Sequence, residues 1–170
     1  MQARFLLKMD PAKVKAQLEH QVRQNVMKAG LHFRNELVQA VNNEGTGREY
    51  PVPGTGRIEQ VEIINKRGRR QKVRKRIGAT MHRASAPYES PAVLFGQLKT
   101  HMAVEFVEEG SRFIAKVGPR GVPYAKRLEF GFNAKDSLGR AYNMAPRPFF
   151  MKTYMEQKDT LIRILRGEQP

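Results

Sequence analysis

One long amphipathic pattern near the N-terminus constrains the fold more than any other feature of this chain. Asp10 followed by Pro11 predicts a helix start, because aspartate caps helices and proline fits their first position. A helix of about 30 residues is about 45 Å long, so we expect one end of its apolar stripe to pack on a sheet and the other to meet a neighbouring subunit. The stripe recurs every three or four positions and consists of Val14, Leu18, Val22, Val26, Ala29, Phe33, Leu37 and Ala40 or Val41.

The sequence also predicts a strongly basic β-hairpin after the long helix. Glycines and prolines between residues 45 and 56 indicate a loop after the long helix. Alternating apolar residues over 58–65 and 71–77, on either side of Gly68, then predict two antiparallel strands. Within residues 66–76, eight of eleven side chains are Lys or Arg and none is acidic. More than half of the formal net charge of +15 therefore lies in this one segment.

The rest of the chain predicts short elements and a second long helix. Residues 2–7 favour a short opening strand, and Ser90-Pro91 favours a short helix that continues toward Met102. We expect two strands joined by a tight turn over 103–117, a short helix over 124–130, a loop to Pro146 and a final helix after Pro148. These elements predict an α+β fold, in which the long N-terminal helix and the C-terminal helix pack on an antiparallel β-sheet.

The domain organisation that we expect is a single domain over residues 1–170. The basic β-hairpin is an arm inserted within it over residues 57–83. The chain has enough residues to bury a core of its own.

Composition excludes several classes of function. The chain has no cysteine, so disulfides, thiolate catalysis and cysteine-ligated metal sites are excluded. Without a secretory signal or a long apolar run we expect a soluble protein that is cytoplasmic when made, with no membrane contact. The positive charge favours nucleic acid, an anionic surface or an acidic protein as partner.

Residues of the kinds that carry chemistry are present but not grouped. The four histidines have neither the spacing nor the carboxylate neighbours of a zinc site. Glu105, Glu108 and Glu109 lie in or beside a predicted strand among Lys and Arg, which favours ion pairing over acid–base catalysis. The Gly-Thr-Gly segments 45–47 and 54–56 lack the GK[ST] ending of a phosphate-binding loop and indicate turns. We expect no catalytic, cofactor or metal site, and hence no enzyme.

The basic segment is the candidate contact site. Cations on a ribbon can bind phosphates without distinguishing bases, and no aromatic residue interleaves them for base stacking. A DNA-facing surface, docking on an acidic protein neighbour and a solvated loop all remain open. The residues of this candidate site are Lys66, Arg67, Arg69, Arg70, Lys72, Arg74, Lys75 and Arg76.

Three ordered fragments carry a resemblance to a known family. They are residues 82–92 (HRASAPYESPA) followed by Gly96-Gln97-Leu98, then 123–131 (PYAKRLEFG), then 145–150 (APRPFF). This order, between a long first helix and a terminal helix, resembles the small tail-component or neck (tail-completion) proteins of lambda-like tailed bacteriophages. Tyr88 departs from the family pattern, which favours glycine there, and the basic hairpin looks like an insertion or elongation.

The resemblance implies a structural role in the virion. It implies a homo-oligomeric ring, a hexamer by analogy with phage tail and neck rings, in the neck or tail. Such a ring joins head-closure or adaptor proteins to tail-tube or tail-terminator proteins around the DNA channel, where nonspecific DNA contact is expected. The runner-up is a sequence-independent DNA-binding protein that uses the same hairpin, and a phage-encoded nuclease or toxin is a further rival.

Around the fragments, burial and hydrogen bonding predict a scaffold. We expect Tyr124, Leu128 and Phe130 to pack a short helix on the sheet, and Glu129 to cap the last helix or pair with Arg147. Phe149 and Phe150 are expected to anchor that helix by burial. The alternative is a subunit interface, for which the candidate residues are Tyr124, Glu129, Phe130, Arg147, Phe149 and Phe150.

Overall fold

The computed structural model describes residues 10–41, 45–135 and 138–168. The strand predicted for residues 2–7 lies outside them. Four helices and eight strands follow one another along the described chain. They are α1 (Pro11–Ala40), β1 (Glu49–Pro51), β2 (Arg57–Ile64), β3 (Arg70–Ile77), β4 (Met81–Arg83), α2 (Gln97–Thr100), β5 (Met102–Glu109), β6 (Arg112–Pro119), α3 (Ala125–Phe130), β7 (Phe132–Lys135), β8 (Ala141–Met144) and α4 (Phe150–Leu165).

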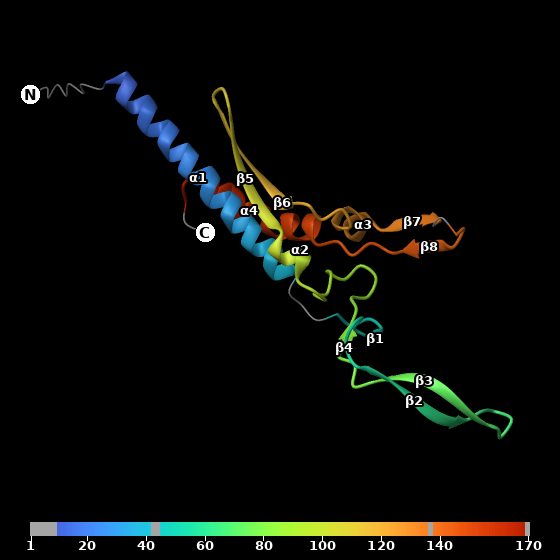
Figure 1. The fold of residues 1–170 in the computed structure, drawn as a ribbon. Helices are drawn as coiled ribbons and strands as arrows, with labels where there is room; N and C mark the ends of the chain where they lie inside the picture. The colour runs from blue at the N-terminus through green and yellow to red at the C-terminus, as the bar shows by residue number, and fades with distance from the viewer. Residues whose placement is uncertain (1–9, 42–44, 136–137, 169–170) are drawn as a thin grey trace, which may run out of the picture.

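The α+β class is confirmed, with long N-terminal and C-terminal helices. The strands form four separate antiparallel pairs, β1–β4, β2–β3, β5–β6 and β7–β8, in place of the single sheet that we expected. Figure 1 shows an elongated molecule with the start of α1 at one end and the β2–β3 pair at the other. Only the β5–β6 pair lies along α1, beside α4.

The long helix begins as its sequence predicts. The Asp10 side chain accepts a hydrogen bond of 3.0 Å from the backbone N–H of Ala12, and Pro11 occupies the first turn. The C-terminal half of α1 lies in the core through Phe33 and Leu37. The N-terminal half of the same apolar stripe is exposed, with Leu18 61% accessible. The stripe therefore has a packed end and an uncovered end.

The core gathers at the C-terminal end of α1. Phe33 packs edge-on against the Phe150 ring, with centroids 5.3 Å apart, and against Tyr154 at 6.1 Å. Burying such aromatic side chains contributes roughly 2–3 kcal/mol each, and this joins α4 to α1. The core residues are Phe33, Leu37, Val41, Leu98, Met102, Val122, Ala125 and Phe149.

Two of the predicted local structures differ from those observed. The helix expected after Ser90-Pro91 is only the single turn α2, and Met102 already opens β5. The loop predicted up to Pro146 contains the short β7–β8 pair. The elements α2, β7 and β8 are each only four residues long, which is too short for a periodic pattern to predict them.

Candidate functional site

The three fragments that carry the family resemblance meet in space at one junction. The Tyr88 N–H donates to the Pro146 carbonyl at 2.8 Å, and the Arg147 Nε donates to the Ser85 carbonyl at 3.2 Å. The Arg147 N–H donates to the Leu128 carbonyl at 2.6 Å. Residues up to 62 positions apart in the chain are thereby fastened to one another. Arg147 acts as the hub, since its side chain reaches the first fragment and its backbone reaches the second.

Glu129 caps the last helix. Its carboxylate accepts hydrogen bonds from the backbone N–H groups of Phe149, Phe150 and Met151 at 2.9–3.0 Å. These donors belong to the start of α4 and have no partner within that helix. A negative charge at this end is also favoured by the helix dipole. The capping alternative is therefore the observed one, while Arg147 bonds to carbonyl oxygens instead of to Glu129.

A second carboxylate fastens the first fragment to the loop after α1. Glu89 accepts hydrogen bonds from Thr46 N–H at 3.0 Å, Thr46 Oγ1 at 3.1 Å and Ala86 N–H at 2.7 Å. The backbone donors of Thr46 and then Ala86 hold the pKa of the Glu89 carboxyl below its ordinary value, because they stabilise the charged form. Glu89 therefore joins two loops that lie 43 residues apart.

The glycines on either side of Thr46 make this close approach possible. A Cβ on Gly45 would lie 2.2 Å from the Ala84 carbonyl, and a Cβ on Gly47 would lie 2.8 Å from the same oxygen. Only glycine lets the two backbones lie this close. The Gly-Thr-Gly segment is thus a backbone contact surface as well as a turn. The sequence signal for it was the pair of glycines two residues apart, but its partner is distant in the chain.

Tyr88 has the backbone conformation that glycine adopts freely. Its φ is +65°, and it is the one non-glycine residue with a positive φ among those that the structure describes. A side chain with a Cβ is strained in this region. The Tyr88 side chain is 70% exposed, so burial does not compensate for the strain. The family pattern favours glycine at this same position.

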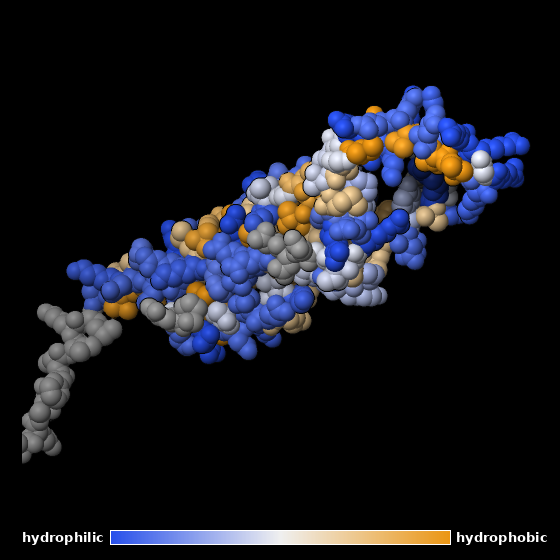
Figure 2. All heavy atoms as spheres, turned by 90° about the horizontal axis from the view of Figure 1, so that it is seen from below, coloured by the Kyte–Doolittle hydropathy of each residue, from blue (hydrophilic) through white to orange (hydrophobic). Residues whose placement is uncertain are grey.

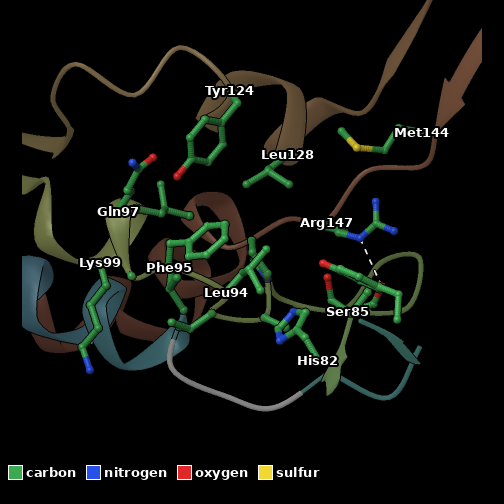
Figure 3. A pocket seen from close by; sticks show the side chains of 18 residues that line it. His82, Ser85, Leu94, Phe95, Gln97, Lys99, Tyr124, Leu128, Met144 and Arg147 are labelled. Atoms are coloured by element: carbon green, nitrogen blue, oxygen red, sulfur yellow. Dashed lines mark hydrogen bonds between the residues drawn. The ribbon is translucent and has the colours of Figure 1, made fainter. Parts of the chain in front are cut away.

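A cavity of about 440 Å³ opens beside the junction. Figure 3 shows Tyr124, Leu128 and Met144 on one side and Phe95, Leu94 and His82 on the other, with Arg147 bonded to Ser85 at the edge. The lining is mainly apolar and includes no aspartate or glutamate. Such a cavity suits an apolar group and offers no carboxylate for proton transfer.

The candidate interface residues separate into buried and accessible ones. Phe149 is only 2% exposed and Glu129 9%, so both are used inside the chain and do not present side chains to a partner. Phe130 is 69% exposed, which corrects our expectation that it packs α3 on the sheet. Tyr124 is accessible at the cavity, and Arg147 and Phe150 are half-buried.

In the basic segment, β2 and β3 pair antiparallel over their whole length. The register places Ile64 opposite Arg70 and Arg57 opposite Ile77. The turn between them is held by the Asn65 side chain, which accepts from the N–H groups of Arg67 and Arg69 at 3.0 Å each. Gly68 supplies the positive φ that this turn needs, at +75°.

The register gives the hairpin two unlike faces. Opposed residues of an antiparallel pair share a face, and successive residues alternate between faces. One face therefore carries Arg70, Lys72, Arg74 and Arg76 of β3, with Ile58, Gln60, Glu62 and Ile64 of β2. The other face carries Val61, Ile63, Val73 and Ile77, with Arg57, Glu59, Gln71 and Lys75. The remaining basic residues, Lys66, Arg67 and Arg69, lie in the turn.

The hairpin stands away from the core. Figure 2 shows apolar residues in a row along this end of the molecule, bordered by hydrophilic ones. Ile63 and Ile77 are 41% and 37% exposed, and Ile58 and Ile64 are more exposed still. At its base, β4 pairs with β1, so residues 81–83 belong to the root and not to the projecting arm. The arm is thus residues 57–77.

Neither a metal cluster nor a membrane span is found in the described parts of the chain. Residues 10–41, 45–135 and 138–168 contain no group of three metal-ligating side chains. None of the helices in these ranges is long and apolar enough to cross a membrane. Comparisons with protein-family models, curated proteins and solved structures found no match to this chain.

Proposed function

We propose that this protein is a structural subunit of a tailed-phage virion, which assembles as a ring in the neck and joins the portal or head-closure complex to the tail around the DNA channel. The observation that carries the proposal is the junction. The three fragments that resemble neck proteins, separate in sequence, are bonded to one another there through Arg147 and Tyr88. The resemblance therefore coincides with one structural unit.

The conformation at Tyr88 supports the same proposal. The family favours glycine at this position, and the Tyr88 backbone lies in the region that glycine alone occupies without strain. A chance resemblance of short fragments has no reason to coincide with a positive φ.

The distribution of exposed apolar residues fits a ring. The first half of α1 exposes Val14, Leu18 and Val22, and the arm exposes Ile63 and Ile77. These patches lie at opposite ends of the molecule (Figure 1). A subunit in a ring meets its two neighbours through two different patches. In the proposed assembly the basic arm either lines the DNA channel or clasps the adjacent ring.

The mechanism in this proposal is assembly by surface complementarity, without bond chemistry. The arm ends in cations and the cavity beside the junction has no carboxylate in its lining. The partners are further copies of the chain, expected as a hexamer, and the adjacent head-closure or adaptor and tail-tube or tail-terminator proteins. The site of action is the virion neck, after synthesis in the host bacterial cytoplasm.

The alternative function is that of a free, sequence-independent DNA-binding protein. The observation that favours it is the exposed row of arginines and lysine on β3. A free DNA binder holds duplex DNA as an isolated chain, with a steep decrease of affinity as salt rises. A neck subunit that has not assembled into its ring binds DNA negligibly at physiological salt, whereas the arms of an assembled ring act together.

The test of the proposal is a mass and shape measurement. We expect light scattering and electron microscopy of the purified full chain to show a symmetric ring, and cryo-electron microscopy of particles that carry the chain to place it at the head–tail junction. A chain that stays monomeric at every concentration and is not found in the particle would exclude the ring.

A further inference from the structure

We infer that Arg70, Lys72, Arg74 and Arg76 form a phosphate-contacting row, which holds the backbone of duplex DNA on one face of the arm. The inference rests on the proposed function, since the duplex in question is the DNA that passes through the channel. It selects four of the nine basic residues of the arm and assigns them one occupant.

The geometry of β3 produces the row. The four residues are separated by two positions each, so their side chains leave the same face at intervals of about 6.7 Å. The row is about 20 Å long. Duplex DNA carries one negative charge per about 1.7 Å of its axis, so every cation of the row has a phosphate within reach.

The charges of the row are not neutralised within the described chain. The ion pairs of the arm and its root join Arg57 to Glu59 and Arg83 to Glu49. None of the four row residues belongs to an ion pair found in the described residues, and all four are exposed. Glu62, opposite Lys72, is the one acidic residue on this face. The face therefore has a net charge of +3, four cations less one carboxylate.

The opposite face differs in both charge and polarity. It carries Arg57, Lys75 and Glu59, a net charge of +1, and four apolar residues, Val61, Ile63, Val73 and Ile77. DNA on that face would cover an apolar centre with phosphates, whereas the two isoleucines of the row face lie at its ends. The two faces are thus distinguishable, and only one of them suits a polyanion.

The polarity along the row favours DNA over an acidic protein. A protein interface has an apolar centre and a polar rim. On this face the middle positions are polar, with Gln60 opposite Arg74 and Glu62 opposite Lys72, and the isoleucines Ile58 and Ile64 lie at the ends. That order is the reverse of a protein interface. Phosphate contacts need no apolar centre and carry no sequence information.

The experiment compares two double variants of the full chain that remove the same charge from the same part of the arm. Arg74→Gln with Arg76→Gln removes two cations of the row. Arg57→Gln with Lys75→Gln removes two cations of the opposite face, at the same level of the hairpin. Binding of a short duplex of mixed sequence is measured by fluorescence anisotropy from about 50 to 200 mM salt, and assembly by light scattering.

Each phosphate contact contributes about −0.9 to the slope of log affinity against log salt. Four contacts give the unmodified chain a slope of about −3.6, which corresponds to a loss of roughly 150-fold over this range. We expect the row variant to have a slope less negative by about 1.8 and the opposite-face variant to keep the original slope. Both variants should assemble as the unmodified chain does.

Several results would overturn the inference. Equal changes of slope in both variants would show diffuse attraction instead of a row. Absence of DNA binding at the lowest salt would remove DNA as the occupant. A row variant that stops assembly but leaves the slope unchanged would assign the row to an acidic protein neighbour. If the slope is face-dependent in a chain that never forms rings, the row is supported and the proposed neck function is rejected.

Discussion

The backbones of Gly30 and Tyr88 each lie in an unusual environment, one crowded and the other strained. At Gly30, α1 comes so close to the β5–β6 pair that an added Cβ would lie 2.9 Å from the Ala115 Cβ and 3.1 Å from Val104 Cγ1. At Tyr88, the chain makes a left-handed turn with a residue that resists it. Gly30 has no side chain because the neighbouring strands leave no room for one. Tyr88 has a side chain although its backbone conformation favours glycine.

Gly30→Ala tests the close approach of helix and strands. Alanine favours helix over glycine by about 1 kcal/mol, but the crowding with Ala115 and Val104 should cost more. We expect the free energy of unfolding to fall by about 1–2 kcal/mol in urea denaturation. Lys28→Ala, an exposed change in the same helix, should stay within about 0.5 kcal/mol. A more stable Gly30→Ala variant would contradict this packing.

Tyr88→Gly tests the strain at the junction. Glycine relieves the positive φ, and the gain exceeds the entropy it adds to the unfolded chain, so we expect a stabilisation of about 0.5–1 kcal/mol. Tyr88→Ala keeps the Cβ and should give no such gain. Thermal unfolding of both variants measures the difference, and equal stabilities would show that the turn is not strained.

At the scale of elements, two carboxylates connect parts of the chain that have no shared sheet. Glu129 joins α3 to the start of α4 through three backbone donors. Glu89 joins the loop after α1 to the loop before α2. The four strand pairs are separate, so these bonds and the apolar core hold the elements in position.

Glu129→Gln should weaken the start of α4. The amide is neutral and presents one acceptor oxygen in place of two, so part of the capping and of the favourable interaction with the helix dipole is lost. We expect unfolding to be easier by about 2 kcal/mol in urea. Glu156→Gln removes a carboxylate from the exposed side of α4 and should change stability by less than about 0.5 kcal/mol.

Glu89 predicts a pH dependence of stability. Its pKa is lowered in the folded chain from the ordinary 4.5, so its contribution is complete above that value and is lost as pH falls through the folded pKa. The difference in unfolding free energy between the unmodified chain and Glu89→Gln should be constant above about pH 5 and shrink at lower pH. Thr46→Val removes the Oγ1 donor to Glu89 but keeps the backbone donors of Thr46 and Ala86. It should therefore lower the unfolding free energy above pH 5 by less than Glu89→Gln does. A pH-independent difference would contradict the lowered pKa.

At the scale of the whole molecule, the packed and unpacked halves of α1 suggest why the chain should assemble. Leu18 continues the same stripe as Phe33 and Leu37, yet it is 61% exposed where they are buried. An isolated two-stranded ribbon such as the arm is also marginally stable by itself. Both ends of the molecule therefore have surface that a neighbouring subunit can cover.

Leu18→Glu should weaken the proposed ring without unfolding the subunit. Covering one leucine contributes about 1.5–3 kcal/mol, so each contact between subunits should become at least about tenfold weaker. Gln17→Glu adds the same charge beside it and should leave assembly unchanged. Light scattering measures the mass, and thermal unfolding checks that both variants fold. Normal rings from Leu18→Glu would exclude this stripe as an interface.

The amino-acid sequence by itself determined the features that depend on neighbours along the chain. The cap at Asp10, the 3.6-residue period of α1 and the strands around Gly68 are local, and each is where its pattern predicts it. The positive charge of the arm can be counted from the sequence alone. Short strands such as β1 and β4 were missed, because three residues show no period and their pairing joins Glu49 to Arg83 across 34 positions of the chain.

Only the tertiary structure decided which residues act together. The packing of α3 and α4 decides which phenylalanine is buried. Phe130 is 69% exposed, whereas Phe149 is 2% exposed. The meeting of three fragments at Arg147 depends on contacts between residues up to 62 positions apart. Such contacts are formed by tertiary packing, which a local sequence pattern does not specify.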